Sequence, residues 1–239
     1  MNVLITGGAS GLGAAITRRL GSKEENKIFF TYFKSRENAS QMEQSFPNTQ
    51  GIQVDFNNIE SLAKLKNLIS KESIDILINN AIVEHTKNHF HKIAPEYFSQ
   101  SFLQNINPTL EITAEAIKVF RKKKFGKIIT ILSSGLINTP PVGWSEYTAN
   151  KAYLHSMVKS WATENASFNI TSNGISPSMM MTDLNDDIDE RYEELATDAH
   201  PLKKLLSVDE VADSVNFLCE ATQQINGINM IINSGVNIL

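Results

Sequence analysis

The stretch NVLITGGASGLGAAITRRL, residues 2–20, contains the pattern that determines the fold class. It opens on a short apolar run and ends on a segment whose apolar residues recur at helical spacing. Between the two, Gly7, Gly11 and Gly13 let the backbone turn tightly. A strand that passes through glycines into a helix predicts the first βα unit of a parallel sheet.

The rest of the chain repeats this alternation of short apolar runs and longer helical segments. The predicted strands are residues 2–6, 27–33, 51–55, 74–79, 127–132, 169–176 and 228–233. The clearest predicted helices are residues 12–20, 59–70, 111–123 and 153–165. Strand and helix alternating to the end predict an α/β fold, a doubly wound parallel sheet of about seven strands with helices on both faces.

Composition narrows the class of protein. A chain of 239 residues, 41% hydrophobic and without a Pro/Gly/Ser-rich linker, predicts a single domain over residues 1–239. A net charge of −4 gives no electrostatic reason to expect nucleic acid or a membrane surface as partner. The lone Cys219 is expected to be a buried apolar residue in a reducing compartment. With no apolar stretch long enough to span a bilayer and no signal peptide before the first strand, the expected location is cytoplasmic.

The glycine turn after the first strand is a candidate phosphate site. Its glycines would let a ligand approach the backbone, and the helix that follows offers free N–H groups and the positive end of its dipole. In a parallel sheet, ligands bind beyond the carboxyl ends of the strands, where this turn lies. The spacing G-x-x-x-G-x-G therefore predicts a dinucleotide cradle, formed by Gly7, Ser10, Gly11, Leu12 and Gly13.

The end of the second predicted strand bears on the choice of dinucleotide. An acid at this place binds a ribose hydroxyl, whereas basic residues accommodate a 2′-phosphate. Here the strand runs into Lys34, Ser35 and Arg36, with Tyr32 near the position expected for an acid. NADP(H) is therefore favoured over NAD(H). The alternative is a basic loop that faces solvent.

These motifs, taken in order, resemble those of a known family. Thr6 to Gly13 match T-G-x-x-x-G-x-G, Asn79 to Ala81 match N-N-A, and Tyr147 to Lys151 match Y-x-x-x-K. Over essentially the whole chain the sequence resembles single-domain short-chain dehydrogenase/reductases, and is similar to their 3-oxoacyl-acyl carrier protein reductase-like members. The resemblance implies a Rossmann fold and hydride transfer between a nicotinamide and a carbonyl or secondary alcohol.

Tyr147 and Lys151 carry the chemistry that the resemblance implies. Residues four apart share one face of a helix and can touch. A lysine ammonium beside the phenol is expected to stabilise the phenolate and so to lower the pKa of Tyr147. Tyr147 would then donate a proton to the substrate oxygen, or accept one in the reverse direction, while Lys151 would also bind the nicotinamide ribose.

Two further catalytic positions follow from the resemblance. A serine that hydrogen-bonds the substrate oxygen is placed at Ser133 by the strand register, with Ser134 as the alternative from the spacing to the tyrosine. An asparagine that holds a water beside the lysine is placed at Asn105, with Asn107 as the alternative. Pro108 follows where the family has glycine, and it is expected to supply a local break in a long helix over residues 96–123.

The resemblance also adds cofactor contacts outside the glycine turn. They are Asp55, Asn79, Ala81, Pro177, Met180 and Thr182, with Tyr147 and Lys151 themselves. Ile82 departs from the family, which has glycine there. The sequence therefore does not predict the path of the backbone in this loop. Residues 179–200, with three methionines and many acids, are the expected substrate lid.

Several functional alternatives remain at the level of sequence. The leading hypothesis is an NADP(H)-dependent reductase or dehydrogenase of a small-molecule carbonyl or alcohol, forming a dimer or tetramer. The alternatives are a catalytically silent NAD(P)-binding regulatory protein, an enoyl reductase or a sugar epimerase, and presentation of the substrate by a carrier protein. No metal site is predicted, because His85, His89 and His91 show no further ligand.

Overall fold

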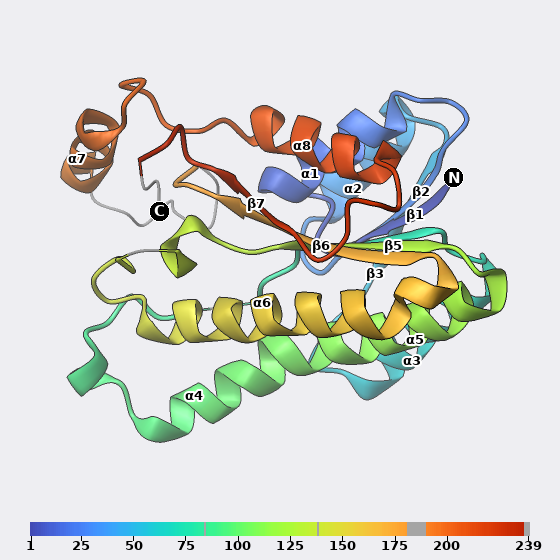
Figure 1. Ribbon diagram of the computed structural model, residues 1–239, viewed down its shortest axis with the longest axis horizontal. Coiled ribbons are helices and arrows are strands. Elements are labelled where there is room, and N and C mark those ends of the chain that lie inside the picture. Colours follow the sequence, from blue (N-terminus) through green and yellow to red (C-terminus); the bar gives the residue numbers. More distant parts are fainter. Residues whose placement is uncertain (84, 138, 181–189, 237–239) are drawn as a thin grey trace.

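A parallel sheet forms the centre of the molecule in the computed structural model, which describes residues 1–83, 85–137, 139–180 and 190–236. Its seven strands lie in the order β3-β2-β1-β4-β5-β6-β7, and every neighbouring pair is parallel (Figure 1). The strands are β1 (Asn2–Ile5), β2 (Lys27–Tyr32), β3 (Thr49–Gln53), β4 (Ile76–Asn79), β5 (Gly126–Ile131), β6 (Ile170–Pro177) and β7 (Asn229–Ile232). The strand order reverses between β1 and β4, which opens a crevice for ligands at the carboxyl ends of these strands.

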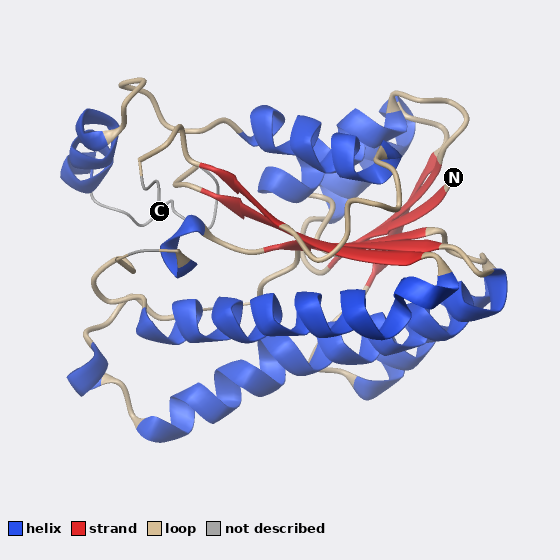
Figure 2. Ribbon diagram, in the orientation of Figure 1, coloured by secondary structure: helices blue, strands red, loops and turns tan. Residues whose placement is uncertain are grey.

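Helices cover both faces of the sheet, as Figure 2 shows. One face carries α1 (Gly11–Gly21), α2 (Arg36–Ser45) and α8 (Val208–Glu220). The other carries α3 (Ile59–Lys71), α4 (Pro95–Ser101), α5 (Asn107–Lys123) and α6 (Ser145–Asn165). Helix α7 (Glu190–Ala199) lies beyond the end of the sheet where β6 and β7 finish. Within the described ranges, no helix has the length and apolar character needed to cross a membrane.

The core is divided by the sheet into two apolar layers. Val3 and Ile5 of β1 face the α1 and α8 layer, whereas Leu4 between them faces the α3, α5 and α6 layer. Burial on both faces explains why the strands appear in the sequence as continuous apolar runs and not as alternating ones. The predicted doubly wound sheet with helices on both faces is confirmed.

Most strand boundaries agree with the sequence prediction to within two residues, and the largest shift of a whole strand is at β3. Strand β3 begins at Thr49 and ends at Gln53, whereas residues 51–55 were expected. Helix α2 was not among the predicted helices, because only Ala39 and Met42 are buried on it and its apolar periodicity is weak.

The long helix expected over residues 96–123 contains the predicted break. Between α4 and α5, the five residues Phe102–Ile106 form a π-helical turn, and Pro108 follows in the first turn of α5. Proline provides no N–H for the preceding turn, and single π turns widen a helix locally. As a result, the side chain of Asn105 is buried in this turn.

A buried lysine caps the C-terminal end of α8. Lys127 on β5 is only 4% exposed, and its ammonium donates to the carbonyl oxygens of Leu218, Cys219 and Ala221 at the end of α8. Burial lowers the pKa of Lys127. Cys219 beside it is buried as predicted, and burial raises the pKa of its thiol to about 12.

Replacing Lys127 with Met is therefore expected to destabilise the fold. The methionine fills a similar volume but leaves the carbonyl oxygens at the end of α8 without their donor, which costs about 2 kcal/mol in the free energy of unfolding. Urea denaturation followed by circular dichroism measures this difference. Lys122→Met, an exposed position on α5, is the control and is expected to have no effect. Equal stability of the two variants would contradict the role of Lys127 as a cap of α8.

Candidate active site

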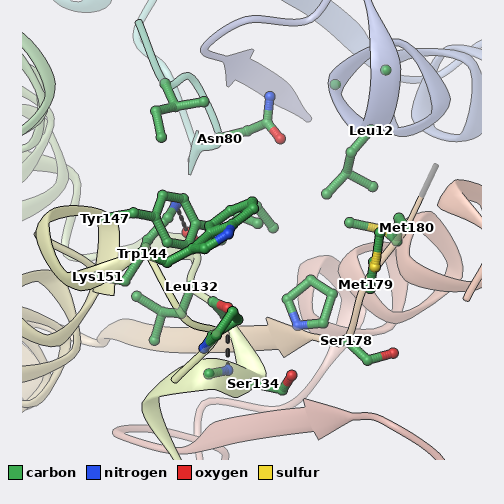
Figure 3. A pocket seen from close by; sticks show the side chains of 18 of the residues that line it. Leu12, Asn80, Leu132, Ser134, Trp144, Tyr147, Lys151, Ser178, Met179 and Met180 are labelled. Carbon is green, nitrogen blue, oxygen red and sulfur yellow. Dashed lines mark hydrogen bonds between the residues drawn. The ribbon is translucent and has the colours of Figure 1, made fainter. Parts of the chain in front are cut away.

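A cavity of about 450 Å³ lies at the carboxyl ends of the strands, at the point where the strand order reverses. Figure 3 shows Tyr147, Lys151 and Trp144 on one side of it, with Leu12, Met179 and Met180 opposite. The remaining walls come from the glycine turn and from the segments that follow β4, β5 and β6. Elements distant in sequence thus meet at one site, as expected for this class of sheet.

The glycine turn forms the floor for a phosphate group. Gly7 and Gly11 have φ values of +67° and +49°, in the left-handed region that favours glycine. Ser10 is the N-cap of α1, but its side chain makes no capping hydrogen bond, and the first turn of the helix contains no acidic residue. The N–H groups of Gly7 and Gly8 donate to Thr31, so the N–H groups at the start of α1 are the ones that can bind an anion.

Gly13 is required by the close approach of helix and turn. A Cβ added at Gly13 would lie 1.9 Å from the carbonyl oxygen of Gly7 and 2.7 Å from Nδ2 of Asn80. The Asn80 amide itself donates to the carbonyl oxygens of Thr6 and Gly7, at 2.9 and 3.2 Å. Asn80 thereby holds the turn and lines the cavity, a role that the sequence prediction missed because it assigned contacts only to Asn79 and Ala81 of this motif.

Tyr147 and Lys151 lie together on the same face of α6, as their spacing predicted. The Lys151 ammonium is 5.6 Å from the centre of the Tyr147 ring and donates to the carbonyl oxygen of Ile131 at 2.7 Å. Burial lowers the pKa of Lys151 to about 8. Both side chains line the cavity.

The pKa of Tyr147 differs from the sequence expectation. Burial raises it to about 12, and a hydrogen bond with the Ser133 side chain opposes this increase only partly. The expectation of a lowered pKa was wrong for this structure, because loss of water around the phenolate outweighs the stabilisation expected from Lys151. Tyr147 is therefore a neutral phenol with a proton to donate.

The two candidate serines occupy different positions. Ser133 lies two residues after the end of β5, its side chain lies close enough to the phenol of Tyr147 to lower the pKa of Tyr147, and its oxygen accepts the N–H of Gly135 at 3.2 Å. Ser134 begins a 3-10 turn, Ser134–Leu136, and lines the same cavity without that contact to the phenol. The geometry favours Ser133 as the partner of Tyr147.

Asn105 lies behind the cavity and not in its lining. Its side-chain oxygen accepts the N–H of Val83 at 2.7 Å, and its amide nitrogen donates to Ser101 on α4. The main-chain carbonyl of Asn105 accepts the hydroxyl of Thr109. Asn107, the alternative, is in the first turn of α5, and its side-chain amide hydrogen-bonds Glu111 with both groups exposed to solvent.

The cavity brings together most, but not all, of the predicted cofactor residues. Those that line it are Gly7, Ser10, Gly11, Leu12, Gly13, Ala81, Tyr147, Lys151, Pro177 and Met180. Those outside its lining are Lys34, Ser35, Asp55 and Asn79. Asp55 accepts the N–H of Asn57 in the turn after β3, and Asn79 is buried with its amide on Thr113. Thr182 lies outside the described residues, as does part of the expected lid over residues 179–200.

The residues present fit a dinucleotide. Besides the uncapped start of α1, the buried hydroxyl of Ser178, which lines the cavity next to Pro177, has no hydrogen-bond partner among the residues that the structure describes. A buried polar atom without a partner is uncommon in native proteins and is usually satisfied by a bound group or water. Ser178 and the glycine turn thus provide polar groups at two places along one cavity.

A second hollow of about 440 Å³ adjoins the first at Ser10 and Gly11 and extends between α1 and α2. Arg18 and Asn38 line it. The sequence prediction did not include Arg18, although Gly11, Ala14 and Arg18 follow one face of α1 at helical spacing and could have been identified from that periodicity. Arg18 is thus a further cationic residue in a hollow that includes part of the glycine turn.

Comparisons with known proteins identify the family of the chain. A family model described as enoyl-(acyl carrier protein) reductase matches residues 7–237. The chain is 30% identical to the 3-oxoacyl-[acyl-carrier-protein] reductases FabG of Rickettsia prowazekii and Aquifex aeolicus, covering 98% of this chain and 95% and 96% of theirs. The solved structure of ElxO with NADP bound is 26% identical, with a TM-score of 0.87 over 98% of each chain.

The match of the family model extends over nearly the whole chain, and the fold, the glycine turn and the Tyr147–Lys151 pair agree with it. The chain belongs to the short-chain dehydrogenase/reductase family of NAD(P)-dependent oxidoreductases.

Proposed function

We propose that this protein is an NADP(H)-dependent reductase of a small-molecule ketone or aldehyde, acting in reverse as a secondary alcohol dehydrogenase. The observation that carries the proposal is the phenol of Tyr147, which lies beside Lys151 and lines, together with Ser133, a cavity continuous with the glycine turn. A pure nucleotide-binding protein has no need of this arrangement. The alternative of a silent regulatory protein is therefore less well supported.

The proposed mechanism assigns one task to each polar side chain. When bound, the nicotinamide would supply a hydride to the carbonyl carbon. Tyr147 would donate its proton to the carbonyl oxygen as negative charge develops there. Ser133 would hydrogen-bond the same oxygen, so that the substrate is held against the phenol. The Lys151 ammonium would then stabilise the phenolate that proton donation leaves behind.

The remaining cavity wall favours an uncharged substrate. On the substrate side, it is formed largely by apolar side chains, including those of Ile82, Pro141, Trp144 and Met179. A charged group placed against these residues would lose its water without gaining a partner. We therefore expect turnover with apolar ketones or aldehydes, or with acyl thioesters whose reacting end is neutral. A spectrophotometric assay of NADPH oxidation against such a panel tests this function directly.

The preference for NADP(H) rests on two exposed cations and on the relatives. Lys34 and Arg36 follow β2 at the place where a ribose 2′-phosphate would lie, and within the described residues neither has an acidic partner. They lie outside the lining of the cavity, as exposed side chains that can close on an arriving phosphate. The solved relative ElxO has NADP bound, which is consistent with the same choice here.

Replacing Lys34 with Ala is expected to weaken NADPH binding while leaving NADH binding unchanged. Loss of one charge-assisted hydrogen bond to the 2′-phosphate corresponds to about a tenfold increase in Kd. Titration of the reduced cofactors, followed by their fluorescence, measures both constants. Lys64→Ala, an exposed position on α3, serves as the control. If the wild-type protein bound NADH more tightly than NADPH, the proposed cofactor preference would be wrong.

A further inference from the structure

A buried carboxylate lies immediately before the tyrosine in the sequence. Glu146 is 1% exposed, which is unusual for a charged side chain and costs free energy unless the carboxylate is hydrogen-bonded. Its oxygen Oε1 accepts the hydroxyl of Ser101 and, at 2.7 Å, the amide of Asn150. Its oxygen Oε2 accepts the backbone N–H of Thr86 at 3.4 Å. Glu146 therefore joins helix α4, helix α6 and the segment that follows β4.

The same network holds this segment at a second point. The Ser101 hydroxyl also accepts the amides of Asn150, at 2.8 Å, and of Asn105, at 3.2 Å. Asn105 in turn accepts the N–H of Val83. Val83 and Thr86 are thus each held through their backbone N–H groups by polar side chains of the helical layer.

The anchored segment carries a ring that lies against the tyrosine. The His85 ring lies 4.8 Å from that of Trp144 and 5.3 Å from that of Tyr147, centre to centre. Trp144 and Tyr147 are themselves 5.2 Å apart in an edge-to-face arrangement. Such spacings are those of aromatic rings in packing contact. His85 therefore packs beside the phenol ring, and Trp144, in contact with both rings, lines the cavity.

A close backbone contact completes the arrangement. Gly143 has a φ of +88°, and a Cβ added there would lie 3.1 Å from the carbonyl oxygen of Lys87. The Lys87 ammonium lies 5.6 Å from the centre of the Trp144 ring. The segment after β4 and the start of α6 therefore pack against one another with little free space.

We propose that Glu146 is a positioning residue that, with Ser101 and Asn150, latches Val83 and residues 85–88 onto the start of α6. In this position, His85 packs against Tyr147 and Trp144, and Trp144, which lines the cavity, limits which carbonyl compounds reach the phenol. The second part of the proposal rests on the proposed reductase function. The first part concerns only the structure of the latch and can be tested without turnover.

Glu146→Gln tests the latch because glutamine keeps the size of the side chain but replaces one acceptor oxygen with an NH₂ donor. The glutamine would direct this donor at one of the groups that now donate to Glu146. Ser101→Ala loosens the same network from α4 and serves as a second variant, should the first fail to fold. Glu164→Gln, an exposed position on the same helix, is the matched control.

The fluorescence of Trp144 provides a direct measurement of the latch. The chain has two tryptophans, so a Trp161→Phe background leaves Trp144 as the sole source of tryptophan fluorescence. We expect acrylamide to quench this fluorescence more strongly in Glu146→Gln and in Ser101→Ala than in the background protein or in Glu164→Gln. Unchanged quenching in both network variants would refute the latch, whatever the activity of the protein.

Steady-state kinetics test the link to substrate selection. We expect KM for the carbonyl substrate to rise about tenfold in Glu146→Gln, the equivalent of one hydrogen bond to a charged group, with kcat less affected and the Kd of NADPH unchanged. The effect of the double variant Glu146→Gln with Ser101→Ala is expected to be smaller than the product of the two single effects, because both act on one network. Stronger quenching with an unchanged KM would refute control of substrate access. A wild-type protein that reduces no carbonyl compound would refute the proposed function instead.

Discussion

Tyr147→Phe is expected to lower kcat for carbonyl reduction by about a thousandfold, because the variant keeps the ring and loses the proton donor. Burial raises the pKa of Tyr147 to about 12, so the phenol is expected to keep its proton at neutral pH. Ser133 remains in the variant to hydrogen-bond the substrate oxygen, so binding is retained better than turnover. The rate of NADPH oxidation under saturating substrate measures the loss.

The control for this variant lies on the same helix. Tyr153 on α6 is 39% exposed and packs edge to face against Phe102, with ring centres 5.0 Å apart. Tyr153→Phe removes a hydroxyl from the same residue type outside the cavity and is expected to leave kcat unchanged. The Kd of NADPH is expected to be unchanged in both variants. Activity within tenfold of wild type in Tyr147→Phe would remove Tyr147 from the role of proton donor.

Gly13→Ala is expected to weaken NADPH binding by about a hundredfold. The added methyl group would lie 1.9 Å from the carbonyl oxygen of Gly7, so the start of α1 must move away from the glycine turn. This movement displaces the N–H groups proposed to bind the pyrophosphate, and loss of two such charge-assisted hydrogen bonds corresponds to about two powers of ten in Kd. Fluorescence titration measures Kd, and circular dichroism verifies that the variant is folded.

A second glycine of the same cavity provides the matched control. At Gly135 an added Cβ would lie 3.3 Å from Cδ of Pro141, a contact that a small local shift relieves. Gly135→Ala is therefore expected to bind NADPH as the wild type does. A folded Gly13→Ala protein with wild-type affinity would show that the close approach of α1 to the turn is not needed for the cofactor.

Much of the fold could be predicted because it depends on local sequence patterns. Short apolar runs identified all seven strands, most clearly the inner strands β1 and β4, because strands buried on both faces favour apolar side chains at successive positions. The break in the long helix near Pro108 was also predictable, because a proline cannot donate to the preceding turn. Helix α2 was missed because only Ala39 and Met42 are buried on it, so its apolar residues do not recur clearly at helical spacing.

The candidate site was predictable where its residues are close in sequence or follow a strand. The glycine turn and the Tyr147–Lys151 pair each lie within one element and line the cavity as expected. Lys34 and Asp55 also follow strands, yet both lie outside the cavity lining. A position after a strand predicts at which edge of the sheet a residue lies, but it does not predict how far the residue lies from the crevice.

By itself, the sequence determined the class of sheet, the glycine turn and the face of α6 that carries Tyr147 and Lys151, because these follow from local spacing and from burial. Only the tertiary structure decided that the phenol is neutral, that Ser133 and not Ser134 contacts it, and that Glu146 connects three segments behind it. The pKa of a side chain and the partners of a buried carboxylate depend on how much water the packed neighbours exclude. Those neighbours come from α4, β5 and the segment after β4, which are distant in the sequence from α6.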